Sequence, residues 1–503
     1  MLHYLLKINE YKNYLSCFLI LFLFWISINT GSKYLVMDYS IHNNLGILIN
    51  LLRSLIPYFL ILFFLIFFKK FKVIEILKSN WFFKLFFLYG LLQLIGLIYI
   101  GENLHEHYWA ICLFALLLFF NFILQIKDKN ICNFIFSINK IFLASIFLIF
   151  FFLALKENLF SQNLLYHSKA FVSDYNHERM PRATGLARMS LIIFICSNAL
   201  FFSNIFSKKI KLTLLIINIF TISVIFIFQS RGALLSFCII LVLINLIYNF
   251  SNLKNRLLYV LVSTLIPLLI FLSYPIIKKN LIVEFGLEES SNKNFKKHNF
   301  KNMDMDVEIR GDFFKIDQSN SVKENLSSLS NNRFYAWEFL LQVFLKKEIS
   351  EDIKKAVESQ DYDIAGFDFK DKFSYFVGYG PQADRYFMYN QMVNRKKSKE
   401  VLGPFGFHAS NGYLYSLICS GIMGLITFLA INLIVFTKIL RIFLTKKSLH
   451  INSNPFLSSS ILCILYLQFR ILFENSFSVY GIDMLIFLSS YLIIENEFKN
   501  LNN

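Results

Sequence analysis

The feature that most limits how this chain folds is the set of long apolar runs along it. A helix needs about 20 mostly apolar residues to cross the hydrocarbon core of a bilayer. The sequence therefore predicts an all-α polytopic membrane protein with about twelve transmembrane helices. The twelve runs are 13–30, 44–68, 81–100, 108–126, 134–155, 183–207, 210–228, 232–250, 256–277, 412–437, 457–473 and 479–495.

The amino-acid composition excludes the common soluble classes. Of the 503 residues, 56% are hydrophobic and 17% are charged, whereas soluble domains have about 45–50% apolar and about 25% charged residues. The seven cysteines lie in or beside apolar runs, and none forms a C-x-x-C pair. They are interpreted as small apolar residues, so neither a soluble enzyme nor a secreted disulfide scaffold fits.

The placement of lysine predicts the orientation in the membrane. With the N-terminus in the cytoplasm, the inner segments are rich in lysine, including the pairs at 69–70, 208–209 and 446–447. The short outer loops hold almost none, and Lys33 and Lys169 are the main exceptions. Cytoplasmic loops of membrane proteins are enriched in Lys and Arg. Both termini are therefore expected in the cytoplasm, and the net charge of +17 indicates topology rather than nucleic-acid binding.

The same topology divides the chain into three parts. Residues 1–277 hold the first nine transmembrane helices, 278–411 form one large periplasmic loop, and 412–503 hold the last three helices. The stretch 287–332 is rich in Asn, Ser and Lys, which predicts a loosely ordered insertion. Apolar residues at helical spacing over 332–345 predict an amphipathic helix on the outer surface.

Arginine is distributed differently from lysine. Of twelve arginines, Arg256 and Arg441 alone fall on the inner side. The planar guanidinium fork suits phosphate groups, so this excess predicts an anionic ligand on the outer face. The alternative is that arginines such as Arg470 are interfacial anchors or pair with acids such as Glu474. The outer set is Arg53, Arg179, Arg182, Arg188, Arg231, Arg310, Arg333, Arg385, Arg395 and Arg470.

Four short stretches on the outer side combine polar and glycine residues at helix ends. They are Arg182–Arg188, Gln229–Gly232, Asn332–Trp337, and His408–Leu414 with Gly421 and Gly424 after it. Asn411 is predicted to be the N-cap of the next helix. His408 is the one histidine expected where the polar loop meets the membrane, which makes it a candidate general base. A hydrogen-bonded structural histidine is the alternative.

Together these motifs resemble those of the O-antigen ligase and O-antigen polymerase superfamily. The matching residues are Ser230-Arg231-Gly232, Arg333 to Trp337, Gly378-Tyr379-Gly380-Pro381, and His408 to Asn411 with Gly421 and Gly424. The resemblance covers about residues 180–480. It implies a GT-C-like, multi-pass glycosyltransferase of the bacterial inner membrane, active in lipopolysaccharide or surface-polysaccharide biosynthesis. Ligases of the family usually have His directly followed by Asn, whereas here Ala409 and Ser410 separate His408 from Asn411. The resemblance therefore leaves both ligation and polymerisation open.

The resemblance also implies roles for individual residues. A polyprenyl-diphosphate-linked glycan would be the donor, and lipid A core or a growing polysaccharide would be the acceptor. Cations would stabilise the charge of the leaving diphosphate, and no cofactor or metal would be required. The expected roles are catalytic for His408, diphosphate-binding for Arg231, Arg333 and Arg182, and supporting for Ser230, Gly232, Trp337 and Asn411.

Two rival functions fit the same composition. A glycolipid or polysaccharide transporter or flippase would have charged residues at mid-membrane depth and a repeated architecture. The sequence has no evident internal repeat, and its charges gather near predicted helix ends. A membrane sensor whose loop binds a ligand is the second rival, and it gives no reason for arginine at several outer turns. Membrane lipids are expected partners in every case, and nucleic acid in none.

Overall fold

A computed structural model shows how the chain is arranged. It describes residues 2–28, 55–63, 65–66, 80–100, 104–126, 128–160, 183–203, 205–228, 230–248, 253–284, 333–345, 350–351, 354, 362–364, 373–384, 393–395, 409–445 and 454–502.

Long apolar helices dominate the described part of the chain. Helices can span a bilayer because each one satisfies its own backbone hydrogen bonds, which lipid cannot do. Seven of them are long and apolar enough to cross a membrane, so the protein is a helical membrane protein. These seven are α5 (Trp81–Ile100), α6 (Leu104–Ile126), α7 (Lys129–Phe160), α9 (Ala183–Phe202), α10 (Lys208–Ile227), α12 (Leu253–Glu284) and α18 (Gly412–Thr445).

Four further helices pack with these seven. They are α1 (Leu2–Ser27), α11 (Arg231–Ile247), α20 (Pro455–Arg470) and α21 (Ile482–Asn502). Eleven of the twelve predicted runs therefore coincide with a described helix, and the run 44–68 lies largely outside the described residues. Helix α12 continues beyond the predicted run 256–277, to Glu284.

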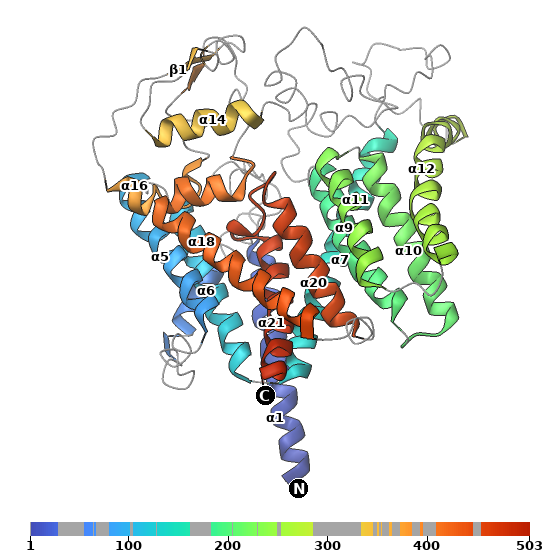
Figure 1. Ribbon diagram of the computed structural model, residues 1–503, viewed down its shortest axis with the longest axis horizontal. Coiled ribbons are helices and arrows are strands. Elements are labelled where there is room, and N and C mark those ends of the chain that lie inside the picture. The colour runs from blue at the N-terminus through green and yellow to red at the C-terminus, as the bar shows by residue number, and fades with distance from the viewer. Residues whose placement is uncertain are drawn as a thin grey trace.

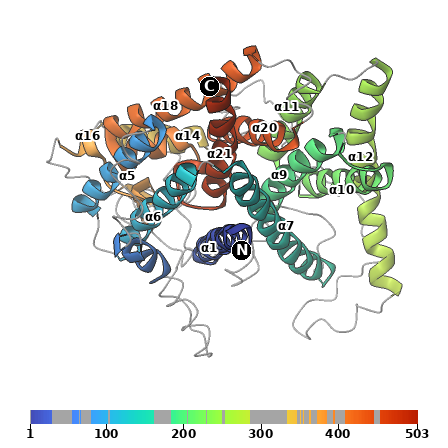
Figure 2. The same cartoon turned by 90° about the horizontal axis from the view of Figure 1, so that it is seen from below.

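The helices form two groups joined by a central set. Helices α9, α10, α11 and α12 lie on one side, α5, α6 and α18 lie on the other, and α7, α20 and α21 lie between them (Figures 1 and 2). Both chain ends lie at one end of the bundle, and the elements of the long loop lie at the other (Figure 1). We call the second end, which carries α14, α16 and the β1–β2 pair, the loop end.

Aromatic residues fill much of the interior. The ring of Phe82 stacks on that of Tyr491 with centroids 3.6 Å apart, and Phe477 stacks on Phe487 at 3.9 Å. The small residues 458–460, all Ser, are buried in α20 and allow neighbouring helices to approach closely. Outward-facing positions are also apolar, as along the exposed side of α12, which is typical of a surface covered by lipid.

The loop end contains one longer helix and several short elements. Helix α14 (Arg333–Phe344) confirms that a helix forms over the predicted stretch 332–345. The loop end also contains a short antiparallel pair that the sequence did not predict, formed by β1 (Tyr362–Ile364) and β2 (Val393–Arg395). Strands of three residues are too short to show an alternating pattern in the sequence. The remaining short elements are α16 (Ser374–Val377) and η3 (Ser476–Ser478).

Helix α18 is broken near its start. Gly421 has φ +69° and ψ −170°, so the part that begins at Gly412 and the longer part after Gly421 follow different directions (Figure 1). This φ lies in the region that favours glycine. A helix broken at this point leaves backbone carbonyl groups without helical partners, and the loop end supplies donors for them.

Candidate functional site

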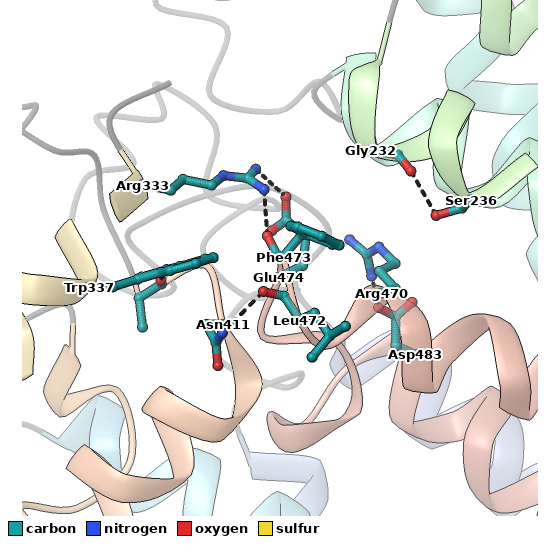
Figure 3. A network of polar contacts seen from close by, with 11 residues as sticks. Gly232, Ser236, Arg333, Trp337, Asn411, Arg470, Leu472, Phe473, Glu474 and Asp483 are labelled. Carbon is teal, nitrogen blue, oxygen red and sulfur yellow. Dashed lines mark hydrogen bonds and ion pairs between the residues drawn. The ribbon is translucent and has the colours of Figure 1, made fainter. Parts of the chain in front are cut away.

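Most of the residues predicted to form a site lie at the loop end. Ser230 and Gly232 lie at the start of α11, Arg333 and Trp337 lie on α14, and Asn411 precedes α18 (Figure 3). Arg231 is the first residue of α11, and its side chain is outside the described set. Arg182 and His408 both lie outside the described residues.

Asn411 caps the N-terminus of α18, as the sequence predicted. Its Oδ1 accepts hydrogen bonds from the backbone N–H groups of Tyr413 and Leu414, each at 3.0 Å. Its Nδ2 donates to the backbone oxygen of Leu472 at 3.1 Å, and the neighbouring N–H of Gly412 donates to the oxygen of Ile471 at 2.8 Å. Asn411 therefore fixes the end of the long loop to the segment that follows α20.

Ala409, the residue directly after His408, is held from two sides. Nε1 of Trp337 donates to the Ala409 oxygen at 2.7 Å, and the Ala409 N–H donates to Oδ2 of Asp384 at 2.8 Å. Asp384 is fully buried and also accepts from Nδ2 of Asn475 at 3.3 Å. Sequence reasoning missed Asp384. The one available signal was its position four residues after the Gly-Tyr-Gly turn.

The turn at Gly378–Gly380 packs tightly against two helices. A Cβ on Gly96 of α5 would lie 2.4 Å from the backbone nitrogen of Gly380, and one on Gly378 would lie 2.4 Å from the backbone of Cys419 and Ser420. Both turn glycines have positive φ, +78° and +91°. Only residues without a Cβ allow this approach, which explains why this glycine motif stands out in the sequence.

Arg333 joins α14 to the segment between α20 and α21. Its Nη1 donates to the backbone oxygen of Phe473 at 2.7 Å, and its Nη2 pairs with Oε1 of Glu474 at 3.0 Å (Figure 3). About a quarter of each side chain is exposed. The guanidinium thus has a structural task in addition to the diphosphate contact that the motif implies.

A second arginine cluster surrounds a buried carboxylate. Nη1 of Arg470 pairs with Oδ2 of Asp483, and Nε of Arg188 lies 3.5 Å from Oδ1 of the same residue. The alternative interpretation of Arg470, pairing with an acid, is confirmed with Asp483 as the partner, while Glu474 pairs with Arg333. The contact from Arg188 is longer, and its Nε has no hydrogen-bond partner among the described residues.

This second cluster has an excess of positive charge. Arg188 and Arg470 both face the carboxylate of Asp483, whose side chain is 4% exposed. The nearby carboxylate of Glu474 is paired with a third arginine, Arg333. Arg188 is on α9 and Arg470 ends α20, and both helices pack against α11, which begins with Arg231. The ends of three packed helices therefore carry arginine at the same end of the bundle, an arrangement suited to a phosphate-bearing ligand.

Backbone strain is concentrated in the same region. Three described non-glycine residues have positive φ: Gln382 (+65°), Ser410 (+49°) and Ser476 (+45°). Each lies within two residues of a member of the Asp384 network. Such conformations cost of order 1–3 kcal/mol each and are found preferentially at functional sites. The strain marks the network around Asp384 and Ala409 as part of the candidate site.

No protein-family profile, no curated protein and no solved structure matches the chain.

Proposed function

We propose that the protein is a membrane glycosyltransferase of the O-antigen ligase or polymerase type. It transfers a glycan from a polyprenyl diphosphate to an acceptor at the periplasmic face of the inner membrane. The acceptor is lipid A core in the ligase reaction or a growing polysaccharide chain in the polymerase reaction. The proposal rests on the motif resemblance together with the position of the motif residues at one end of the helix bundle.

One observation carries the proposal: motifs far apart in sequence converge on one backbone turn. Trp337 and Asp384 both bind Ala409, and Asn411 holds the start of α18 to Leu472. Packing of the loop against the helices does not by itself explain an excess of arginine close to this turn. Arg188 and Arg470 supply that excess around Asp483. A rigid turn beside surplus positive charge is what transfer from a lipid diphosphate requires.

The chemistry assigns a separate task to each group. An acceptor hydroxyl oxygen forms a bond to the anomeric carbon of the donor sugar, and the bond from that carbon to the diphosphate oxygen breaks. The diphosphate leaves with the electron pair, so negative charge grows at the membrane surface. Arg188, together with Arg231 and Arg182 from the predicted set, stabilises that charge. His408 accepts the proton of the acceptor hydroxyl as general base.

Deletion of the gene tests this function in the cell. Gel analysis of the surface polysaccharide should then show one of two changes. Loss of all capped lipopolysaccharide, with free polymer accumulating, supports the ligase. A single repeat unit left on the core supports the polymerase. An unchanged polysaccharide pattern would contradict the proposal, and accumulation of donor on the cytoplasmic side would favour a flippase.

A further inference from the structure

The short helix α16 lies at the edge of the bundle, where it touches two membrane helices. Figures 1 and 2 both show it beside α5 and α18, at the margin of the molecule. The contact is close on the α18 side, since a Cβ on Gly421 would lie 2.3 Å from the backbone oxygen of Phe376. It is also close on the α5 side, through the contact of Gly96 with Gly380.

These contacts set the depth of α16 along the bundle. The apolar span of α5 covers Trp81–Tyr99, and Gly96 lies three residues inside its end. At 1.5 Å per residue, Gly380 therefore sits about 5 Å below the end of that span. The loop thus descends below the level at which the α5 span ends.

The backbone of this segment meets the requirement of a nonpolar environment. The N–H groups of Tyr379 and Gly380 donate to the oxygens of Ile418 and Cys419, each at 3.0 Å, and that of Gly378 donates to Ser374 at 2.8 Å. Those two carbonyls of α18 precede the break at Gly421. Non-helical backbone at membrane depth is tolerated when its polar groups are satisfied within the protein.

The side chains of the segment divide into two faces. Ser374 and Val377 are buried against the protein, whereas Phe373 and Phe376 are 53% and 54% exposed. Water disfavours two large exposed aromatic side chains on one turn. A lipid environment accommodates such side chains, and aromatic residues are favoured where a peripheral helix enters the acyl region of the bilayer.

The two phenylalanines extend apolar surfaces that already face outward on both neighbouring helices. On α5 these are Leu91, Leu94 and Ile98, the last of which is 81% exposed. On α18 they are Ile422, Met423 and Ile426, directly after the break. Because α5 and α18 belong to the membrane-crossing set, their outward apolar faces are expected to contact lipid, and α16 packs against both helices.

We propose that α16 inserts Phe373 and Phe376 into the hydrocarbon of the nearer membrane leaflet, so that lipid chains are the partner of this surface. The insertion anchors the Gly378–Gly380 turn at a fixed depth. Asp384 follows that turn by four residues and binds Ala409. The lipid anchor therefore fixes the depth of the candidate site relative to the membrane surface. The proposal does not depend on the glycosyltransferase assignment.

Spin labels at single cysteines test the insertion in the full-length protein reconstituted in nanodiscs. Cys196 and Cys238, the two native cysteines that are not buried, are first replaced by Ser. Labels are then placed by Phe373→Cys or Phe376→Cys. Met423→Cys serves as a lipid-facing control, and Glu351→Cys, whose side chain is 75% exposed, serves as an aqueous control.

Collision rates with two relaxing agents then report the environment. Labels at 373 and 376 should collide more often with oxygen, which concentrates in lipid, than with a water-soluble nickel chelate. The label at 423 should show the same preference, and the label at 351 should show the opposite one. A preference for the nickel chelate at both positions would place α16 in water and overturn the proposal. Low collision rates with both agents would mean that protein covers the surface, which overturns it equally.

A second measurement needs no substitution. A membrane-resident carbene reagent is photolysed in vesicles that contain the wild-type protein, and labelled peptides are mapped by mass spectrometry. The peptide that contains Phe373 and Phe376 should be labelled to a similar degree as the one that contains Ile422 and Met423. The absence of label on the first peptide, with label on the second, would contradict insertion even if the cysteine variants fail to fold.

Discussion

Arg188 is the residue whose surroundings point most directly to an external anion. Arg470 holds the close contact with Asp483, while Arg188 approaches the same carboxylate at 3.5 Å. Asp483 balances Arg470 and Glu474 balances Arg333, so Arg188 retains net charge. Its side chain is also 23% exposed, which leaves it open to a ligand at the end of the bundle.

Replacement of Arg188 by Gln should weaken binding of polyprenyl diphosphate. Hydrogen bonds to charged groups contribute about 1.5–3 kcal/mol, which corresponds to a Kd increase of roughly 10- to 150-fold. The measurement is titration of the lipid diphosphate onto the protein in nanodiscs. Arg441→Gln is the matched control, because Arg441 lies near the C-terminal end of α18, away from the loop end. This variant should bind the lipid diphosphate as the wild type does. Equal affinity in Arg188→Gln and wild type would remove Arg188 from the ligand site.

His408 is expected to act on the chemical step and not on donor binding. His408→Gln should slow glycan transfer by about 100- to 10,000-fold, because the acceptor hydroxyl loses its base. The lipid diphosphate should bind with nearly unchanged affinity. Both quantities are measured with purified protein in the presence of a chelator. Full transfer activity in His408→Gln would exclude His408 as the base. A loss of thermal stability in His408→Ala that His408→Gln restores would indicate a structural histidine.

Residues whose role is local were predicted from the sequence more readily than residues paired through the fold. Asn411 was identified as an N-cap because its hydrogen bonds reach only two and three residues along the chain. The pairing of Arg188 with Asp483 joins positions almost 300 residues apart. No local pattern encodes such a contact, and the same applies to Asp384 and Ala409.

At the scale of elements, the break in α18 is the feature that brings the motifs together. The Gly378–Gly380 turn donates hydrogen bonds to the carbonyls of Ile418 and Cys419, just before the break. Gly421 permits this through its positive φ and through its closeness to Phe376. The glycine motifs seen in the sequence therefore belong to one joint between the loop and α18.

Gly421→Ala should destabilise this joint. The φ of +69° and ψ of −170° at Gly421 are essentially restricted to glycine and cost other residues of order 1–3 kcal/mol. The new Cβ would also lie 2.3 Å from the Phe376 oxygen. The melting temperature in detergent should fall. Gly232→Ala is the matched control, because a Cβ there meets nothing within 4 Å among the described atoms. It should melt within a degree or two of the wild type. Equal melting of both variants would contradict the role of Gly421.

Helix positions followed from hydropathy far better than their ends or irregularities did. The run 81–100 coincides with α5. A single apolar segment in lipid must satisfy its own backbone hydrogen bonds, and it does so as an α-helix. The break at Gly421 was not predicted, because it depends on a loop that docks from 40 residues earlier. The β1–β2 pair was not predicted for a similar reason, since its strands are stabilised by each other and lie about 30 residues apart.

At the scale of the whole molecule, the long loop lies opposite both chain termini. This agrees with an odd number of crossings between the N-terminus and the loop, as the lysine asymmetry predicts. Helices α14 and α16 mark the loop end, and the N- and C-termini mark the other (Figure 1). The positive-inside rule predicts that the loop end faces away from the cytoplasm.

A reporter fusion decides the orientation. An enzyme that is active only outside the cytoplasm, fused after Asn320, should be active in cells. A reporter that is active only in the cytoplasm should be silent at the same position and active when fused after Asn503. The reverse pattern would invert the topology, and a periplasmic reaction at the loop end would then be excluded.

The most direct test of the account is glycan transfer by the purified protein in proteoliposomes. The components are a polyprenyl-diphosphate-linked glycan, a glycan or lipid A core acceptor, and a chelator. The account predicts that glycosylated acceptor and free polyprenyl diphosphate form in equal amounts, and that Arg188→Gln and His408→Gln both reduce this yield. If the donor stays intact while it moves across the bilayer, the protein is a transporter and the account is contradicted.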